Sequence, residues 1–214
     1  MTIYICGDST AASYAPERAP MTGWGQLLGG LLPEIRVENR AMAGRSTKSF
    51  LSEGRLQAIE REIRPGDLLL IQFTHNDESD LVWRHTDPWT GFRNNLEIFI
   101  DTARQNRAVP VLLTPICIRC WRDGGLQESH GAYPAVIRQL AARRNVPLID
   151  LYEDSTRLVR ELGETESRKL YMHVEPGIYP DYPEGRTDDA HTREAGAKAY
   201  AGFVEEGLRK LGLC

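Results

Sequence analysis

Residues able to carry out acyl transfer lie near both ends of the sequence. Ser9 follows a short apolar run of β type in Gly7-Asp8-Ser9-Thr10, and Asp188 and His191 stand three residues apart near the other end. A serine hydroxyl becomes a nucleophile when an imidazole removes its proton, and a carboxylate can orient that imidazole through its second nitrogen. These residue types predict Ser9 as nucleophile, His191 as base and Asp188 as the group that orients the base.

Two further residues are candidates for stabilising the negative charge that such an attack creates. Gly44 lies in a loop after a second strand-like run, and Asn76 follows a third. We expect the N–H groups of Ser9 and Gly44 and the side-chain amide of Asn76 to form an oxyanion hole, where loss of one donor typically costs about 2.7–4 kcal/mol. Each residue alone has a structural explanation, as a cap or a turn, so their joint placement carries the argument.

The elements that must position these residues alternate between strand-like and helical patterns. This βαβ alternation predicts an α/β fold, a three-layer α/β/α sandwich with a mostly parallel, flavodoxin-like sheet, in a single domain over residues 1–214. Ligands gather at the carboxyl ends of such strands, so Ser9, Gly44, Asn76 and the last loop should share one rim. We expect a helix to begin at Ser9 and an irregular loop over 171–186. The expected strands are 3–6, 36–39, 67–73, 109–114 and 146–151, and the expected helices are 24–32, 49–64, 94–106, 133–145, 156–162 and 193–211.

The composition is that of a folded protein and excludes several function classes. Of 214 residues, 41% are hydrophobic and 26% charged, with a net charge of −4 and no basic stripe, so we expect neither nucleic acid nor a membrane as partner. No signal-peptide pattern follows Met1, which predicts a cytoplasmic location. We interpret the Cys117-Ile-Arg-Cys120 spacing as two incidental thiols rather than a redox or half-zinc motif, and we expect no metal and no cofactor.

Taken together, the motifs resemble those of the SGNH (GDSL-type) hydrolase superfamily, and more narrowly its rhamnogalacturonan acetylesterase-like branch. The similarity covers almost the whole chain. It rests on Gly7–Thr10, Thr22–Gln26, Gly44–Phe50 with Glu53–Leu56, Pro65–Asp67 through Phe73–Asp77, Tyr133–Ala135 with Val146–Leu151, and Asp188–His191 with Glu194–Ala197. The resemblance implies a serine esterase that removes acetyl groups from a carbohydrate, with Ser9, Asp188 and His191 as catalytic residues and Ser9, Gly44 and Asn76 as oxyanion donors.

The sequence departs from the family pattern at two positions. Thr74 stands where the family usually has glycine, and a side chain there is expected to narrow the cleft or alter the approach to Asn76. Ala190 replaces a frequent threonine in the last block, which is a milder difference. These departures bear on the choice of substrate more than on the catalytic residues.

Candidates for substrate contact lie in loops on the expected rim. Trp83, Trp89 and Trp121 offer aromatic faces on which sugar rings can stack, although each is equally explained by packing of its loop. His75 adjoins Asn76, and a hydrogen bond behind the site is the favoured use of its ring. Arg45 and Arg84 are candidates for contacting a uronic acid carboxylate. The expected substrate is thus a small-molecule or oligosaccharide acetyl ester.

Other functions stay open on the sequence. The same fold can be a catalytically silent carbohydrate-binding protein, or an esterase, lipase or thioesterase for another small acyl ester. A flavodoxin-like nucleotide binder fits the βαβ pattern but lacks a GxGxxG or GxxxxGK[ST] loop after the first strand. The segment 171–186 is expected either to close over substrate or to form a contact in a homo-oligomer, and the sequence does not choose.

Overall fold

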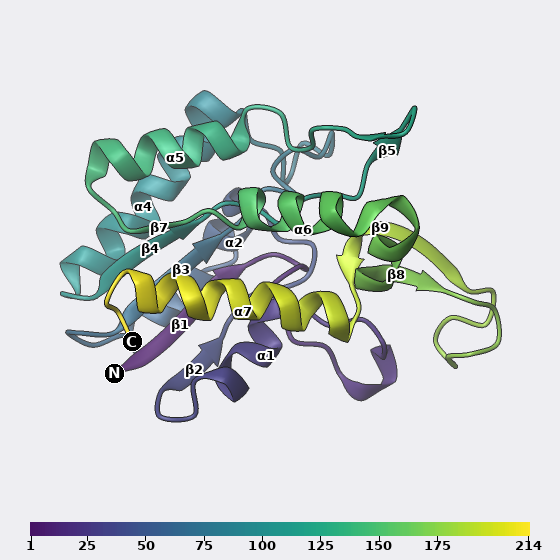
Figure 1. Cartoon of the computed structure of the whole chain (residues 1–214). Coiled ribbons are helices and arrows are strands. Elements are labelled where there is room, and N and C mark those ends of the chain that lie inside the picture. Colours follow the sequence, from purple (N-terminus) through teal and green to yellow (C-terminus); the bar gives the residue numbers. More distant parts are fainter.

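The computed structural model describes residues 1–214, and a five-stranded sheet forms its centre (Figure 1). The sheet has the order β2-β1-β3-β4-β7, and every neighbouring pair is parallel. The strands are β1 (Thr2–Gly7), β2 (Arg36–Asn39), β3 (Leu68–Gln72), β4 (Val109–Leu113), β5 (Trp121–Arg122), β6 (Gly125–Leu126), β7 (Leu148–Ile149), β8 (Tyr171–Val174) and β9 (Arg186–Thr192). The helices are α1 (Trp24–Leu31), α2 (Thr47–Ser52), α3 (Arg55–Glu60), α4 (Arg93–Gln105), α5 (Tyr133–Arg144), α6 (Leu151–Glu166) and α7 (Glu194–Lys210), with short turns of helix η1 (Pro16–Arg18), η2 (Pro88–Phe92) and η3 (Ser167–Leu170).

Helices cover both faces of the sheet, which confirms the predicted three-layer fold. Successive side chains of a strand point to opposite faces, so β1 places Ile3 and Ile5 in one hydrophobic layer and Tyr4 and Cys6 in the other. The first layer is closed by α1, α6 and α7, and the second by α2, α3, α4 and α5. Because β1, β3 and β4 run in the same direction, the loops after their carboxyl ends meet at one rim.

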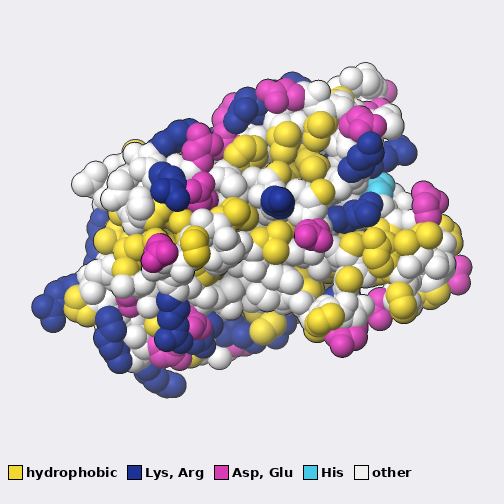
Figure 2. All heavy atoms as spheres, turned by 60° about the horizontal axis from the view of Figure 1, so that its bottom comes forward, with side chains coloured by type: hydrophobic (Ala, Val, Ile, Leu, Met, Phe, Trp, Pro, Cys, Tyr) yellow, Lys and Arg dark blue, Asp and Glu magenta, His cyan; other side chains and the backbone are white.

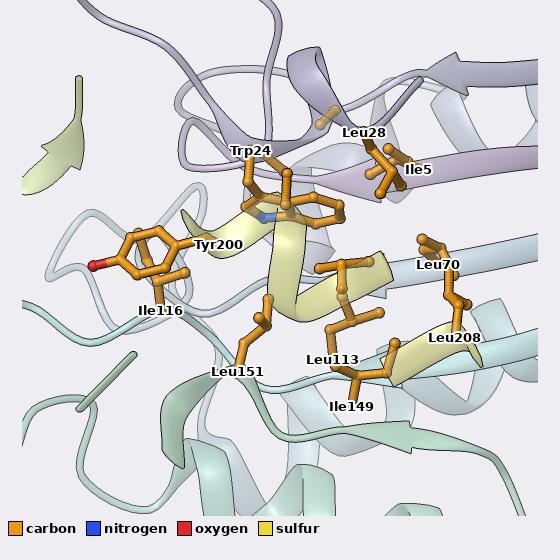
Figure 3. Close-up of a cluster of buried hydrophobic side chains, with 14 of the residues drawn as sticks. Ile5, Trp24, Leu28, Leu70, Leu113, Ile116, Ile149, Leu151, Tyr200 and Leu208 are labelled. Atoms are coloured by element: carbon orange, nitrogen blue, oxygen red, sulfur yellow. The ribbon is translucent and has the colours of Figure 1, made fainter. Parts of the chain in front are cut away.

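Trp24 anchors the first layer close to this rim. Its indole is completely buried beside Ile5 and Leu28, and Figure 3 shows it packed between β1 and α7. The indole N–H donates to Oε1 of Gln72 at 3.1 Å, and the hydroxyl of Thr10 donates to the same oxygen at 3.1 Å. Burying 150–250 Å² of aromatic side chain stabilises a fold by roughly 4–6 kcal/mol. The end of β1 and the end of β3 are therefore held together just behind Ser9.

Three expected elements differ from the structure in their extent. The expected helix over 49–64 is divided into α2 and α3, because Gly54 adopts a left-handed φ of 71° at the start of α3. The expected strand over 146–151 pairs only at Leu148–Ile149, and α6 begins at Leu151 rather than at position 156. Asp150 explains the short strand and the early start of α6, since its carboxylate accepts the N–H of Glu153 and so caps the helix at residue 150.

The segment expected to be an irregular loop contains a strand instead. Residues Tyr171–Val174 form β8, which pairs antiparallel with β9 in a separate two-stranded sheet, and the loop proper is limited to 175–185. β9 begins at Arg186 and includes Asp188 and His191, which were expected in the last loop. The expectation was wrong because the pairing partner of β9 is a segment whose own strand pattern is weak.

The surface carries charges of both signs. None of the helices combines the length and the apolar character needed to cross a membrane. On the face shown in Figure 2, basic and acidic side chains are intermingled with apolar ones.

Candidate active site

Ser9 lies in a tight turn immediately after β1. The turn is closed by the N–H of Ala12, which donates to the carbonyl of Asp8 at 3.1 Å, and it does not continue as the expected helix. The carbonyls of Thr10 and Ala11 accept instead from the N–H of Trp24 and from the side chain of Asn39, so they are not available for helical bonds. The backbone N–H of Ser9 therefore lies at a turn, and a helix dipole does not contribute to it.

A bulge in β9 turns His191 toward this serine. Tyr171 pairs with Thr192 while Met172 pairs with Asp188, so the three residues 189–191 have no counterpart on β8. Oδ1 of Asp188 accepts the backbone N–H groups of Ala190 and His191, each at 2.9 Å, and fixes the shape of the bulge. Residue 191 lies in this bulge, and its imidazole reaches the serine that follows β1.

Ser9, His191 and Asp188 form a continuous chain of hydrogen bonds. Oγ of Ser9 lies 3.0 Å from Nε2 of His191, although 182 positions separate the two residues. Nδ1 of the same ring lies 2.9 Å from Oδ2 of Asp188. Burial alone would raise the pKa of Asp188, but hydrogen bonds from His191 and Ala190 hold it far below its usual value, so this carboxyl is ionised. Such a chain can pass the serine proton to the imidazole and stabilise the imidazolium that results.

Three candidate N–H donors belong to residues that line one cleft, Ser9, Gly44 and Asn76. Gly44 has a φ of 80°, a conformation that favours glycine, and a turn closed by the N–H of Arg45 on the carbonyl of Met42 holds its loop. The backbone N–H groups of Ser9 and Gly44 have no acceptor within the chain. Nδ2 of Asn76 donates one hydrogen to the carbonyl of Arg45 at 3.1 Å and keeps its second N–H unused. The arrangement can therefore receive an oxyanion.

These groups line one cleft of about 380 Å³. Three of its wall residues have small or medium apolar side chains, and two carry charges of opposite sign. Its volume is within the range of small-ligand sites. The lining residues are Ser9, Ala43, Gly44, His75, Asn76, Glu78, Arg84, Ile118, Ala190 and His191. All five residues predicted for the oxyanion hole and the proton relay thus lie together, Asp188 standing directly behind His191.

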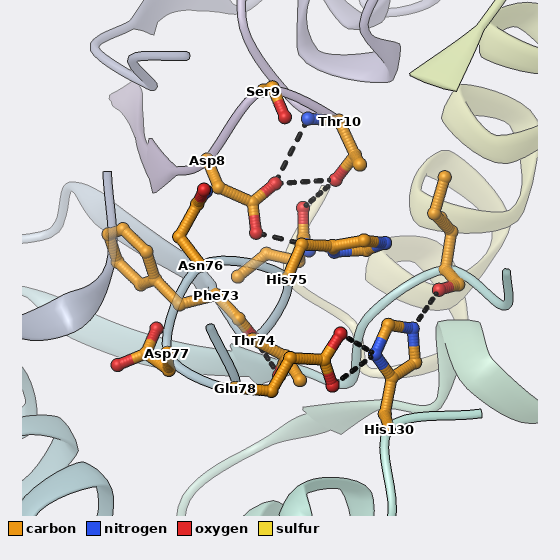
Figure 4. Close-up of polar contacts among 12 residues, drawn as sticks. Asp8, Ser9, Thr10, Phe73, Thr74, His75, Asn76, Asp77, Glu78 and His130 are labelled. Atoms are coloured by element: carbon orange, nitrogen blue, oxygen red, sulfur yellow. Dashed lines mark hydrogen bonds and ion pairs between the residues drawn. The ribbon is translucent and has the colours of Figure 1, made fainter. Parts of the chain in front are cut away.

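A buried pair of opposite charges lies beneath the serine. Figure 4 shows Asp8 between Ser9 and His75, and its Oδ2 is 3.4 Å from Nδ1 of His75. Burial alone would raise the pKa of Asp8 and lower the pKa of His75. The charge and hydrogen bonding of each partner outweigh burial, so the pKa of Asp8 lies below its ordinary value and the pKa of His75 lies above its ordinary value. His130 stacks edge-on against His75 at 4.5 Å and contacts Glu78 at 3.0 Å.

Only some of the predicted substrate-contact residues lie at the cleft. His75 lines the cleft, whereas the guanidinium of Arg45 pairs with Glu53 and only its backbone carbonyl faces the site, through Asn76. Trp83 is 54% exposed next to a cleft residue, while Trp121 packs against the core and does not line the cleft. Thr74 is completely buried and its hydroxyl donates to the carbonyl of Phe73, so it does not narrow the cleft as expected.

No catalytic role was predicted from the sequence for three residues of the site, Arg84, Arg186 and Asp77. Arg84 donates to Oδ1 of Asn76 at 2.9 Å, and Arg186 donates to Oδ2 of Asp188 through Nε at 3.1 Å. Asp77 accepts hydrogen bonds from Thr47 and Thr86 and so joins the loops on either side of Asn76; burial raises its pKa to about 7. The only sequence signal for Arg84 is its position eight residues after Asn76 in the same loop. For Arg186 it is the i, i+2 spacing to Asp188, which puts both side chains on one face of a strand.

The chain is similar in sequence and in overall fold to known proteins. The family model described as the GDSL-like lipase/acylhydrolase family matches residues 5–199. Rhamnogalacturonan acetylesterase RhgT of Bacillus subtilis is 42% identical over 213 residues, which are 99% of this chain and 90% of that protein. The crystal structure of YxiM from Bacillus subtilis superimposes with a TM-score of 0.83 at 29% identity, covering 99% of this chain and 56% of that one.

The acetylxylan esterase Axe2 of Geobacillus stearothermophilus shares the fold, with a TM-score of 0.69 at 18% identity, over 99% of this chain and 94% of that one. Both the family model and RhgT extend across nearly all of the elements that build the cleft. The chain belongs to the GDSL-like lipase/acylhydrolase family.

Proposed function

We propose that this protein is a serine esterase that removes acetyl groups from a carbohydrate, such as an acetylated oligosaccharide derived from pectin, rhamnogalacturonan or xylan. The observation that carries the proposal is the unbroken contact from Ser9 through His191 to Asp188 beside three N–H donors. The ester class is supported by RhgT and by a second Bacillus subtilis relative, the probable rhamnogalacturonan acetylesterase YesY, which is 39% identical. The apolar wall of Ala43, Ile118 and Ala190 suits a methyl group better than a long acyl chain.

In the first half of the reaction the acetyl group moves to the enzyme. Oγ of Ser9 attacks the acetyl carbonyl carbon while Nε2 of His191 accepts the hydroxyl proton. The carbonyl oxygen becomes an oxyanion and receives the N–H groups of Ser9 and Gly44 and the free N–H of Asn76. The tetrahedral intermediate then expels the sugar oxygen, which takes the proton from His191, and acetyl-Ser9 remains.

In the second half water replaces the sugar. His191 accepts a proton from water, the resulting hydroxide equivalent attacks the acetyl carbon, and the same three donors stabilise the new oxyanion. Collapse returns the proton from His191 to Oγ of Ser9 and releases acetate. Asp188 stays ionised throughout, because hydrogen bonds from His191 and from the bulge backbone keep its pKa far below the working range.

An acetate-release screen tests this function. The full chain is incubated with acetylated rhamnogalacturonan, acetylated xylan, acetylated monosaccharides and p-nitrophenyl acetate, alongside p-nitrophenyl butyrate and palmitate and an acyl thioester. We expect acetate from at least one acetylated carbohydrate, little turnover of the palmitate, and near-complete loss of turnover in Ser9→Ala. Ser52→Ala, an exposed serine outside the cleft, is the matched control and should keep wild-type turnover.

Other outcomes identify the alternatives. Binding of an acetylated oligosaccharide without release of acetate would indicate a silent carbohydrate-binding protein. Preference for a longer ester or a thioester would replace the acetylesterase proposal by another acylhydrolase. Wild-type turnover in a clean preparation of Ser9→Ala would remove Ser9 from the mechanism.

A further inference from the structure

The side-chain amide of Asn76 is held from both sides by groups with opposite hydrogen-bonding character. Its Oδ1 accepts from Nη1 of Arg84 at 2.9 Å, and its Nδ2 donates to the carbonyl of Arg45 at 3.1 Å. A guanidinium can only donate and a carbonyl can only accept, so a flipped amide would face two repulsive contacts. The two neighbours therefore determine which end of the amide presents its unused N–H to the cleft.

Arg84 is held in place without a carboxylate partner. No acidic group lies within ion-pair distance of its guanidinium, its Nε is buried with no hydrogen-bond partner, and its only hydrogen bond from the guanidinium is to Asn76. The guanidinium stacks over the ring of Trp83, 5.4 Å from the ring centroid. A half-buried arginine normally pairs with a carboxylate. Here its charge is directed instead at an amide that faces the reacting atoms.

The geometry points to Arg84 as a positioning residue for the oxyanion hole, one that orients the amide of Asn76 and strengthens it as a donor. The inference rests on the proposed function. A charged donor on Oδ1 draws electron density from the amide nitrogen, so the remaining N–H of Asn76 donates more strongly. Because the oxyanion exists only after attack, the effect should appear in kcat far more than in KM. It should be equal for neutral esters and for esters that carry a carboxylate.

A double-mutant cycle between the two residues tests this inference. Turnover of p-nitrophenyl acetate and of an acetylated uronic acid is measured for wild type, Arg84→Met, Asn76→Ala and the double variant. Asn76→Ala is expected to lower kcat roughly 10²- to 10³-fold. We expect Arg84→Met to lower kcat about tenfold or more on both substrates, yet to cost less than about threefold once Asn76 is absent. Arg84→Lys keeps the charge, so its kcat should lie between those of Arg84→Met and wild type. If Arg84→Met does not fold, Arg84→Lys replaces it in the double-mutant cycle.

A spectroscopic readout separates this inference from the esterase proposal. The side-chain ¹H–¹⁵N signals of Asn76 are assigned by their loss in Asn76→Ala and should shift in Arg84→Met, whether or not any ester is turned over. The matched control is Arg122→Met, an exposed arginine on the β5–β6 hairpin, which should leave them in place. An equal loss with and without Asn76, unchanged Asn76 signals, or a rise in KM confined to the acidic ester would overturn the inference. The last result would make Arg84 a binding residue for the substrate carboxylate.

Discussion

Arg186 donates to Oδ2 of Asp188, the same carboxylate oxygen that lies 2.9 Å from Nδ1 of His191. The carboxylate that orients the imidazole is thus also neutralised in part by a guanidinium, whose side chain is about one-third exposed. In the proposed mechanism, the charge on this carboxylate stabilises the imidazolium that forms during turnover. Arg186 therefore acts on the proposed base only through the carboxylate that both residues contact.

Replacing Arg186 changes the pH dependence of the reaction. In Arg186→Met the carboxylate of Asp188 keeps more of its negative charge, which favours the protonated imidazole. We expect the acidic midpoint of the kcat/KM profile to move to higher pH. Arg168 lines a second surface pocket together with Arg186 but has no contact with Asp188, so Arg168→Met should leave the midpoint in place. A shift to lower pH in Arg186→Met would contradict this assignment.

Asp188→Asn should nearly abolish turnover while the protein stays folded. An amide in place of the carboxylate no longer fixes the imidazole tautomer or stabilises its charge, and we expect kcat to fall on the order of 10³- to 10⁴-fold. The neighbouring Asp189 is the matched control, because it pairs with Arg119 and His173 rather than with His191. Asp189→Asn should retain most of kcat in the folded fraction. Comparable losses in the two variants would argue against a special role for Asp188.

The wild-type pH profile provides a second check on Asp188. Its pKa lies far below the usual value, so it remains ionised wherever the protein is active. The acid limb of the kcat/KM profile should therefore report another group and should not follow the titration of a carboxyl. A limb with a midpoint near pH 4 that disappears in Asp188→Asn would contradict the low pKa.

The Asp8–His75 pair should make the stability of the protein depend on pH. Asp8→Asn leaves a buried imidazolium without its partner, and we expect a loss of about 3–5 kcal/mol in the free energy of unfolding near pH 5–6. The contribution of His75 is fully present below its unfolded pKa of about 6.5 and is lost as pH rises through the raised folded value. The contribution of Asp8 is present above about pH 3.9 and is lost as pH falls through its lowered folded value.

Denaturant unfolding at several pH values measures this linkage. The difference between wild type and Asp8→Asn should be largest near pH 5–6 and should shrink as pH rises, when His75 loses its proton. Asp154→Asn, which breaks an exposed pair with Arg157, is the control and should change little at any pH. A difference that stays constant from pH 5 to pH 9 would mean that His75 is neutral in the folded protein.

Trp83 should contribute to the binding of an oligosaccharide but not to chemistry. It is 54% exposed beside Arg84, so its free face can stack on a sugar ring next to the cleft. We expect Trp83→Ala to raise KM for an acetylated oligosaccharide severalfold and to leave turnover of p-nitrophenyl acetate unchanged. Trp89→Ala removes a tryptophan of similar exposure that does not adjoin a cleft residue, and it should affect neither substrate. A fall in kcat on both substrates in Trp83→Ala would instead indicate that the ring supports Arg84.

The sequence by itself determined the fold class and the identity of the residues that meet at the cleft. Parallel strands place their carboxyl ends at one rim, and β2, β1 and β3 are neighbours in the sheet, so the residues that follow them come together. This is why Ser9, Gly44 and Asn76 could be predicted as neighbours from their positions after apolar runs. The same reasoning could not predict the turn at Ser9, because the acceptors that would continue a helix are taken by Trp24 and Asn39 from distant segments.

Only the tertiary structure decided how His191 reaches Ser9 and which residues support the two. The bulge in β9 depends on pairing with β8, and the orientation of the Asn76 amide depends on Arg84 and on the carbonyl of Arg45. The charge state of Asp8 depends on a ring that packs against it from the end of another strand. The periodicity of apolar residues and the turn residues of the sequence determine which helices and strands form. Hydrogen bonds and ion pairs between distant segments depend on where those elements pack in the folded protein, which the sequence pattern does not give.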